Sequence, residues 1–297
     1  MRMPTLRFDV SRHWTHIRQA ALVHRPGIDL RGSPEIRRLA GRAGATIRYR
    51  LGTLYDKGFC MPENPAIAVR WYRQAAEKGY AAAQFSLGAM YADGRGVPRD
   101  YGKALRWYLK AAAQGDPAAQ HNLGLMYAEG QGVPQDYSEA IQWFRKAARR
   151  NNPHSQYNLG ISYAEGQGVQ KDPSGAARWY REAAERGFDL AQYNLAVCYA
   201  EGRGVPHDMR EAARWYREAA EQGFVPAQYN LALLYTDGHG VPQDYVEAYR
   251  WCNLAAARAE DGWGRNIAER KRDLIAGKIT PAQLEEAQRL TGVWSKR

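Results

Sequence analysis

The sequence is poor in cysteine, and its cysteines do not form the patterns that metal sites or disulfide frameworks require. Three occur in 297 residues, each alone: Cys60, Cys198 and Cys252. Zinc sites and small disulfide frameworks need closely spaced or paired cysteines. The sequence therefore predicts neither, and we expect the three side chains to be small buried apolar groups.

Long apolar runs are also missing. Arg7, Asp9, Arg12 and Arg18 interrupt the N-terminal stretch, so that no signal-peptide core is present there. No other stretch approaches the ~18 consecutive apolar residues of a membrane helix. A cytoplasmic protein without a transmembrane segment is the default expectation, which a different start codon or a leaderless export route would change.

A basic excess exists, but the central part of the chain does not share it. The net charge is +11: residues 1–46 hold nine arginines against three acids, residues 263–297 hold eight basic against four acidic residues, and residues 47–262 hold 25 against 24. A nucleic-acid surface usually gathers Lys and Arg on one face of the folded body. The sequence therefore does not favour nucleic-acid binding. An alternative function is a basic N-terminal segment that docks to nucleic acid or to an acidic membrane.

Motifs for catalysis and cofactor binding are absent as well. The recurrent GRGVP and GQGVP loops lack the contexts of phosphate-binding loops, and no GxSxG elbow occurs. His121, His154, His207 and His239 show no metal-ligand spacing. The sequence leaves open a catalytic triad whose members are brought together only by folding. We predict no enzyme activity, no metal and no cofactor.

What the sequence does have is a repeat of 36 residues, which runs from about residue 47 to residue 262. Three sets of residues are in phase: Tyr55, Tyr91, Tyr127, Tyr163, Tyr199 and Tyr235; Trp71, Trp107, Trp143, Trp179, Trp215 and Trp251; Gly58, Gly94, Gly130, Gly166, Gly202 and Gly238. Large rings at fixed phase are typical of a repeated core. We therefore expect six structural units with the Tyr and Trp rings inside.

Each unit has the pattern of two helices. In residues 117–152, Leu123 and Tyr127 fall on one helical stripe, which ends at the loop glycines. Asp136 then stands where a second helix needs its N-cap, and Trp143 shares one face of that helix with several alanines. Such a pair cannot bury its apolar stripes alone, so the units must stack.

The unit AQHNLGLMYAEGQGVPQDYSEAIQWFRKAA closely resembles the Sel-one-like repeat, a relative of the tetratricopeptide repeat. The resemblance implies an all-α, right-handed solenoid of antiparallel helix pairs, whose first helices line a concave face. It also implies a non-catalytic scaffold or adaptor, typically a monomer, that holds a partner protein or peptide in a regulatory or signalling role. Some cysteine-rich relatives have been associated with β-lactam hydrolysis. This chain lacks their paired cysteines, so a hydrolase is only an alternative.

The two ends depart from the repeat. We expect residues 1–32 to be a basic mobile segment, because they show no periodicity. Residues 33–46 have the pattern of a capping helix, residues 47–262 form the six repeats, and residues 263–297 have the pattern of two further capping helices.

One polar set recurs on the first helix of the units. Asn122, Asn158, Asn194 and Asn230 lie 36 residues apart, each seven residues before an acid: Glu129, Glu165, Glu201 or Asp237. Seven residues are about two helical turns, so each pair shares one face. By resemblance that face is concave, and three of the asparagines follow a tyrosine: Tyr157, Tyr193 and Tyr229. These residues are the candidate partner-binding set.

A structural role is the competing interpretation of the same residues. The asparagines could bond to neighbouring repeats, and the acids could pair with Arg178, Arg214 and Arg250, which precede the repeated tryptophans. The sequence leaves both interpretations open.

Overall fold

A computed structural model describes residues 44–59, 62–259 and 262–294, and within these ranges the chain forms fourteen helices and no strand. The predicted all-α solenoid is therefore confirmed. The segment 1–32, most of the N-terminal cap predicted at 33–46, and Cys60 lie outside the described residues.

Twelve of these helices form six pairs, one pair for each repeat. The first members, which we call A helices, are α2 (Ala45–Lys57), α4 (Ala81–Asp93), α6 (Pro117–Glu129), α8 (Pro153–Glu165), α10 (Asp189–Glu201) and α12 (Val225–Asp237). The second members, the B helices, are α3 (Pro65–Glu77), α5 (Tyr101–Ala113), α7 (Tyr137–Ala148), α9 (Pro173–Ala184), α11 (Met209–Glu221) and α13 (Tyr245–Arg258). Each A helix packs most extensively on the B helix that follows it, and each B helix also packs on the next A helix.

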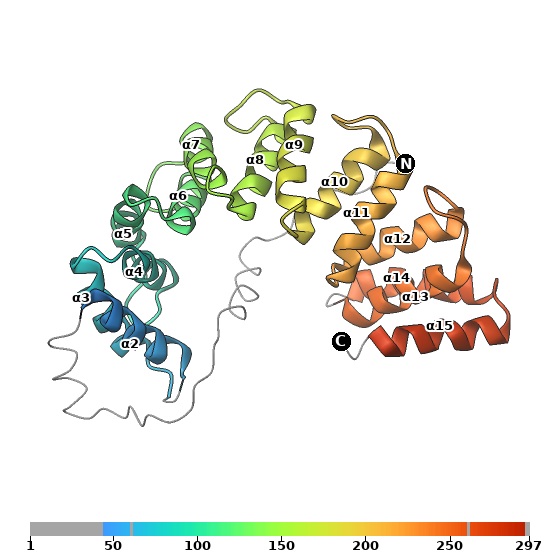
Figure 1. The fold of residues 1–297 in the computed structure, drawn as a ribbon, viewed down its shortest axis with the longest axis horizontal. Coiled ribbons are helices and arrows are strands. Elements are labelled where there is room, and N and C mark those ends of the chain that lie inside the picture. The colour runs from blue at the N-terminus through green and yellow to red at the C-terminus, as the bar shows by residue number, and fades with distance from the viewer. Residues whose placement is uncertain (1–43, 60–61, 260–261, 295–297) are drawn as a thin grey trace.

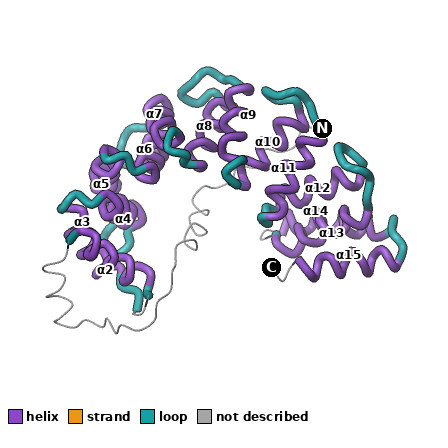
Figure 2. The backbone as a smooth tube through the Cα atoms, viewed as in Figure 1, coloured by secondary structure: helices purple, strands orange, loops and turns teal. Residues whose placement is uncertain are grey.

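The pairs stack into an arc, as Figure 1 shows. Along its first half, α4 and α6 lie on the inner side and α5 and α7 on the outer side. The loops, teal in Figure 2, are longer within a pair, as between α8 (ending at Glu165) and α9 (beginning at Pro173), than between pairs. The last two helices, α14 (Gly262–Ala276) and α15 (Pro281–Trp294), both pack on α13, in the segment for which the sequence predicts a cap.

Helix ends follow local sequence signals. The Asp136 carboxylate accepts hydrogen bonds from the backbone N–H groups of Ser138 and Glu139 at 2.9 and 3.0 Å, which confirms the predicted N-cap. The first loop glycine, Gly130, ends α6 in the left-handed region at φ 71°. The second loop glycine also joins repeats: a Cβ on Gly168 would lie 2.5 Å from the backbone of Tyr137, in the preceding unit.

The core repeats with the sequence. A leucine of each A helix from α4 to α12 is fully buried: Leu87, Leu123, Leu159, Leu195 and Leu231. The small residue after it lets a ring of the B helix approach the A-helix backbone. At Gly88, for example, an added Cβ would lie 2.7 Å from the ring of Tyr108. The close approach of the two helices is thus made by a glycine facing an aromatic ring.

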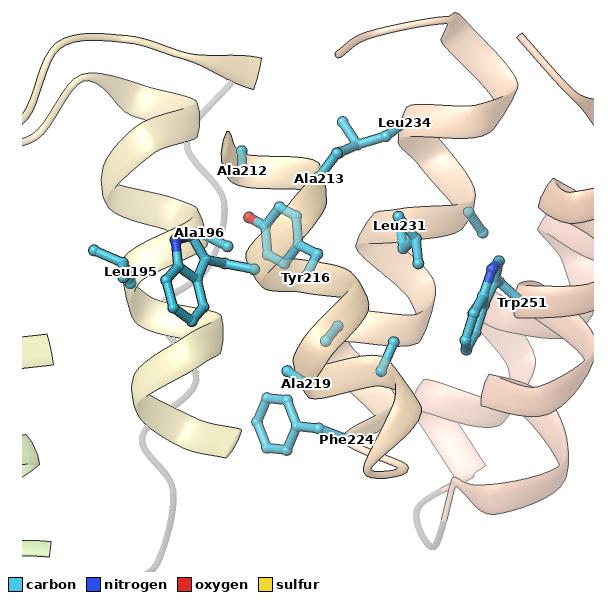
Figure 3. Close-up of a cluster of buried hydrophobic side chains, with 14 of the residues drawn as sticks. Leu195, Ala196, Ala212, Ala213, Tyr216, Ala219, Phe224, Leu231, Leu234 and Trp251 are labelled. Carbon is cyan, nitrogen blue, oxygen red and sulfur yellow. The ribbon is translucent and has the colours of Figure 1, made fainter. Parts of the chain in front are cut away.

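The repeated tryptophans lie nearer the surface than predicted. Trp215 and Trp251 are buried, but the other four are half-buried, and Lys110 and Lys146 cover the rings of Trp107 and Trp143. In every repeat the residue that follows the tryptophan is the more deeply buried of the two: Tyr72, Tyr108, Phe144, Tyr180, Tyr216 and Cys252. Figure 3 shows Tyr216 of α11 between Ala196 of α10 and Leu231 of α12.

Candidate functional site

Charge is divided between the two kinds of helix. The five A helices from α4 to α12 contain no lysine or arginine, and their only charged residues are Asp93, Glu129, Glu165, Asp189, Glu201 and Asp237. Every B helix carries at least two basic residues, and α5 carries three with no acid. The nearly neutral repeat region therefore combines A helices that are acidic from α4 to α12 with B helices that are basic, except for α11, in which three basic and three acidic residues balance.

The predicted acids lie exposed at the C-terminal end of each A helix. Glu165 accepts a hydrogen bond from Gln167 at 2.7 Å, and Glu201 forms an ion pair with Arg203. Both partners are loop residues only two positions away. A carboxylate at a helix C-terminus faces the negative end of the helix dipole, which disfavours it by about 0.3–1 kcal/mol. Local helix stability therefore does not explain this acidic row.

The pairing of these acids with the arginines before the tryptophans is not found. Arg214 pairs with Glu211 at 3.3 Å and Arg250 pairs with Glu247 at 2.9 Å, in each case within the same B helix. Arg178 is exposed on α9. That part of the structural interpretation was wrong, because a residue three positions away on the same helix lies closer than an acid on a different helix.

Three of the asparagines bond across the stack. The amide of Asn194 donates to the Tyr157 hydroxyl at 3.3 Å, one repeat back. Asn230 makes hydrogen bonds with the hydroxyls of Tyr193 and Tyr216, and Asn122 with that of Tyr108. These contacts give the asparagines the structural role that was one of the two interpretations.

Asn158 is the exception. It is half-buried on α8, and its side chain has no hydrogen-bond partner among the described residues. Its counterparts Asn194 and Asn230 bond to the tyrosine one repeat back, but for Asn158 that place is held by His121. The His121 ring instead bonds to Ser155 at 2.9 Å. The side-chain amide of Asn158 is therefore available to a binding partner.

The predicted tyrosines are half-buried between repeats. The Tyr157 ring lies 5.9 Å from that of Tyr180 and 5.3 Å from that of Phe188, and Tyr193 repeats the arrangement with Tyr216 and Phe224. Burial raises the pKa of Tyr157 to about 12 and also raises the pKa of Tyr193 and of Tyr229. These rings hold repeats together, and only part of each surface can meet a partner.

An aliphatic row completes the face, and sequence reasoning missed it. Between each asparagine and its acid, on the same stripe of the A helix, stands a half-buried aliphatic residue: Leu125, Ile161, Val197 and Leu233. These four residues also lie 36 residues apart in the sequence, but the repeated tyrosines and tryptophans are more conspicuous. Each A helix from α6 to α12 thus presents an amide, an aliphatic side chain and a carboxylate along one line.

A glutamine row, also missed, explains how neighbouring pairs are joined. The side-chain amides of Gln84, Gln120, Gln192 and Gln228 donate to the carbonyls of Ala76, Ala112, Ala184 and Ala220 at 3.1–3.2 Å. These carbonyls belong to the last turn of the preceding B helix, and each also accepts the backbone N–H of the glycine three residues later, as Gly79 donates to Ala76 at 3.0 Å. The row is structural and lies buried.

Folding does bring a serine and a histidine together, but not in a form suited to catalysis. Ser155, hydrogen-bonded to His121, is completely buried, so its hydroxyl cannot meet a substrate. Burial, followed by the nearby His154, lowers the pKa of His121 to about 3, which makes the ring a poor general base. Burial also raises the pKa of Cys198 to about 11 and that of Cys252 to about 12, so neither thiol is activated.

Three further properties bear on the kind of site. Within the part of the chain that the structure describes, no group of three or more His, Cys, Asp or Glu residues could hold a metal ion. Cys198 and Cys252 are both free thiols. Among the described helices, none combines the length and the apolarity that crossing a bilayer requires.

Comparison with known proteins agrees with this architecture. The family model of the Sel1 repeat matches residues 48–80, 81–116, 117–152, 153–188, 189–224 and 225–259. A crystal structure of a Sel1 repeat protein from Oxalobacter formigenes is 36% identical over 75% of this chain and 88% of that one, with a TM-score of 0.65. A protective antigen of uropathogenic Escherichia coli strains, which displays an SLR fold, is 30% identical over 88% of this chain and 62% of that one, with a TM-score of 0.52. No curated protein sequence matches the chain.

Proposed function

Because the chain belongs to the Sel1 repeat family, whose members generally mediate protein–protein interactions, we propose that it is a non-catalytic adaptor that binds a segment of a partner protein along its A helices. The binding surface is the line of asparagine, aliphatic and acidic side chains on α6 to α12. The adaptor acts as a monomer in a regulatory or signalling role.

One observation carries this proposal: the A helices repeat a stripe whose aliphatic side chains pack against the core on one side only and stay partly exposed on the other. Most packing within and between repeats is made by the leucines, the B-helix rings and the glutamine row. The aliphatic row is only half-buried, and the acids are exposed. An apolar line flanked by polar groups suits an extended peptide. The apolar line can contact the side chains of the peptide, and the polar groups can form hydrogen bonds with its backbone.

Asn158 and Ile161 are the strongest contact candidates. The free amide of Asn158 can pair with the backbone of a bound segment, as a side-chain amide carries both donors and an acceptor. Ile161 lies three residues later on the same face of α8. The other predicted contacts are Asn122, Asn194, Asn230, Tyr157, Tyr193, Tyr229, Glu129, Glu165 and Glu201, several of which also serve the stack.

The test is affinity purification of the full chain from its native cell, with a matched variant. Asn158→Ala combined with Ile161→Ala should lose the partner that the wild-type chain retains, while circular dichroism shows the helical content of the wild-type chain. Leu109→Ala is the control, because Leu109 is an exposed aliphatic residue on a B helix, α5. Retention of the partner by the double variant, or its equal loss with the control, would contradict binding at the A helices.

A further inference from the structure

The outer face of α5 has a hollow that neither the stack nor the A-helix stripe accounts for. Its volume is about 400 Å³, and it is lined by five residues of this one helix: Lys103, Arg106, Trp107, Leu109 and Lys110. In Figure 1, α5 lies on the outer side of the arc, whereas α4 and α6 lie on the inner side. Because α5 carries three basic residues and no acid, the walls of the hollow are cationic.

Two of the lining residues reverse the charge found at the same place in other repeats. Lys103 occupies the position of Glu139, Glu211 and Glu247, and Lys110 occupies the position of Glu182 and Glu218. Lysine at both positions occurs on no other B helix. The cationic walls are therefore specific to α5 and are not a property of the repeat.

A third departure gives the hollow its apolar side. In four repeats an arginine two residues after the tryptophan donates at 2.6–2.9 Å to a tyrosine hydroxyl of the next A helix: Arg73 to Tyr91, Arg145 to Tyr163, Arg181 to Tyr199 and Arg217 to Tyr235. On α5 this position is Leu109, which is 38% exposed. The helix therefore cannot make this bond between repeats, and it exposes an aliphatic side chain instead.

The cations of the hollow are only partly neutralised. Lys103 pairs with Asp100 at 3.0 Å, but Arg106 and Lys110 are exposed and form no ion pair within the described part of the chain. On α11 the counterpart of Arg106 pairs with a glutamate three residues earlier, and on α5 Lys103 stands at that place. Arg106 and Lys110 are thus available to the acidic groups of a ligand.

We infer that this hollow binds an acidic segment of a partner protein, in which an apolar side chain contacts Leu109 and Trp107 while carboxylates pair with Arg106 and Lys110. Opposite charge selects the partner, and arginine binds carboxylates through two parallel hydrogen bonds. The three cations spread over about 10 Å of the helix axis, which favours a segment with several acidic groups over a single small anion. The site is separate from the stripe on the A helices and does not depend on its function.

Other occupants fit the hollow less well. Residues 1–46 of the chain itself hold nine arginines against three acids, so their charge opposes binding there. A nucleic acid stacks its bases on open aromatic faces, but the Trp107 ring is half-buried and the Lys110 Nζ atom lies 4.3 Å from its centroid. A membrane takes up several apolar side chains, and Leu109 is the only exposed large apolar residue of α5.

The probe is a labelled synthetic peptide, Asp-Glu-Leu-Glu-Asp, measured by fluorescence anisotropy against the full chain. We expect saturable binding that weakens as salt is raised, because exposed charges are screened. The same peptide with serine in place of leucine should bind several-fold more weakly, since the apolar contact is lost. Equal binding of the two peptides would overturn the contact with Leu109 and with it the inferred ligand.

The matched variants use the repeat as their guide. Lys103→Glu with Lys110→Glu gives α5 the pattern of α11, which has glutamate at both positions, and should weaken the acidic peptide roughly tenfold. Arg178→Glu with Arg210→Glu is the control, because it changes the net charge equally at exposed positions of other B helices. Wild-type affinity of the lysine variant, or an equal loss in the control, would overturn the inference.

Further measurements separate this site from the A helices and from other occupants. Leu109→Ala should weaken the acidic peptide several-fold, whereas Asn158→Ala with Ile161→Ala should bind it as the wild-type chain does; the opposite result would overturn the site on α5. Tighter binding of phosphatidylserine vesicles or of single-stranded oligothymidine, lost in the lysine variant, would assign the hollow to a lipid or a nucleic acid and overturn a protein partner. Dimerisation in sedimentation that the lysine variant abolishes would assign it to a second copy, with the same consequence.

Discussion

We expect His121 to make the stability of the stack fall in acid. The ring lies buried on α6, with its Nδ1 atom 2.9 Å from the Ser155 hydroxyl of α8. The rings of Phe144 and His154 lie with their centroids 5.7 Å away. Burial, and then His154, lowers the pKa of His121 from 6.5 to about 3. The neutral ring thus joins the third repeat to the fourth.

The sign follows from proton uptake. Below pH 6.5 the unfolded chain protonates this histidine, whereas the folded chain keeps it neutral down to about pH 3. The stability that the neutral ring contributes is therefore fully present above pH 6.5 and is lost as the pH falls towards 3. Each pH unit is worth about 1.4 kcal/mol. At about pH 5 the folded chain should therefore be less stable by about 2 kcal/mol than at neutral pH.

The assay is urea unfolding followed by circular dichroism at about pH 7 and about pH 5, with His121→Phe as the comparison. Phenylalanine stands at the same repeat position in Phe85, so it fits the site but does not titrate. The wild-type chain should lose about 2 kcal/mol more than His121→Phe between the two pH values. His239→Gln, at an exposed loop histidine, should behave as wild type. Equal losses for wild type and His121→Phe would refute the reasoning.

Three further substitutions test the stack. Gly88→Ala should lower the free energy of unfolding by about 1–3 kcal/mol, because its Cβ would lie 2.7 Å from the Tyr108 ring; a thermal melt no different from wild type would contradict this packing. Gln228→Leu should cost about 0.5–1.5 kcal/mol in urea unfolding, since the carbonyl of Ala220 loses the side-chain donor and keeps only backbone donors such as Gly223 N–H at 2.9 Å. Asp136→Ala removes an N-cap and should cost about 1 kcal/mol in the same assay, and an unchanged midpoint would argue against the cap.

Local features of this protein are determined by the sequence itself. The 36-residue period, the loop glycines and caps such as Asp136 specify where each helix begins and ends, because they act within a few residues of the chain. The acids at the ends of the A helices, and their line with the asparagines, can be counted from the period alone.

Only the tertiary structure decides what each periodic residue touches. Trp143 and Phe144 are neighbours in sequence, but the packing angle between helices buries Phe144 and leaves Trp143 half-buried. In the same way Asn194 meets Tyr157 while Asn158, with the same sequence pattern, is left with a free amide because His121 replaces a tyrosine one repeat away. A helical period gives the direction of a side chain, whereas its partners depend on the residues that stacking brings opposite it.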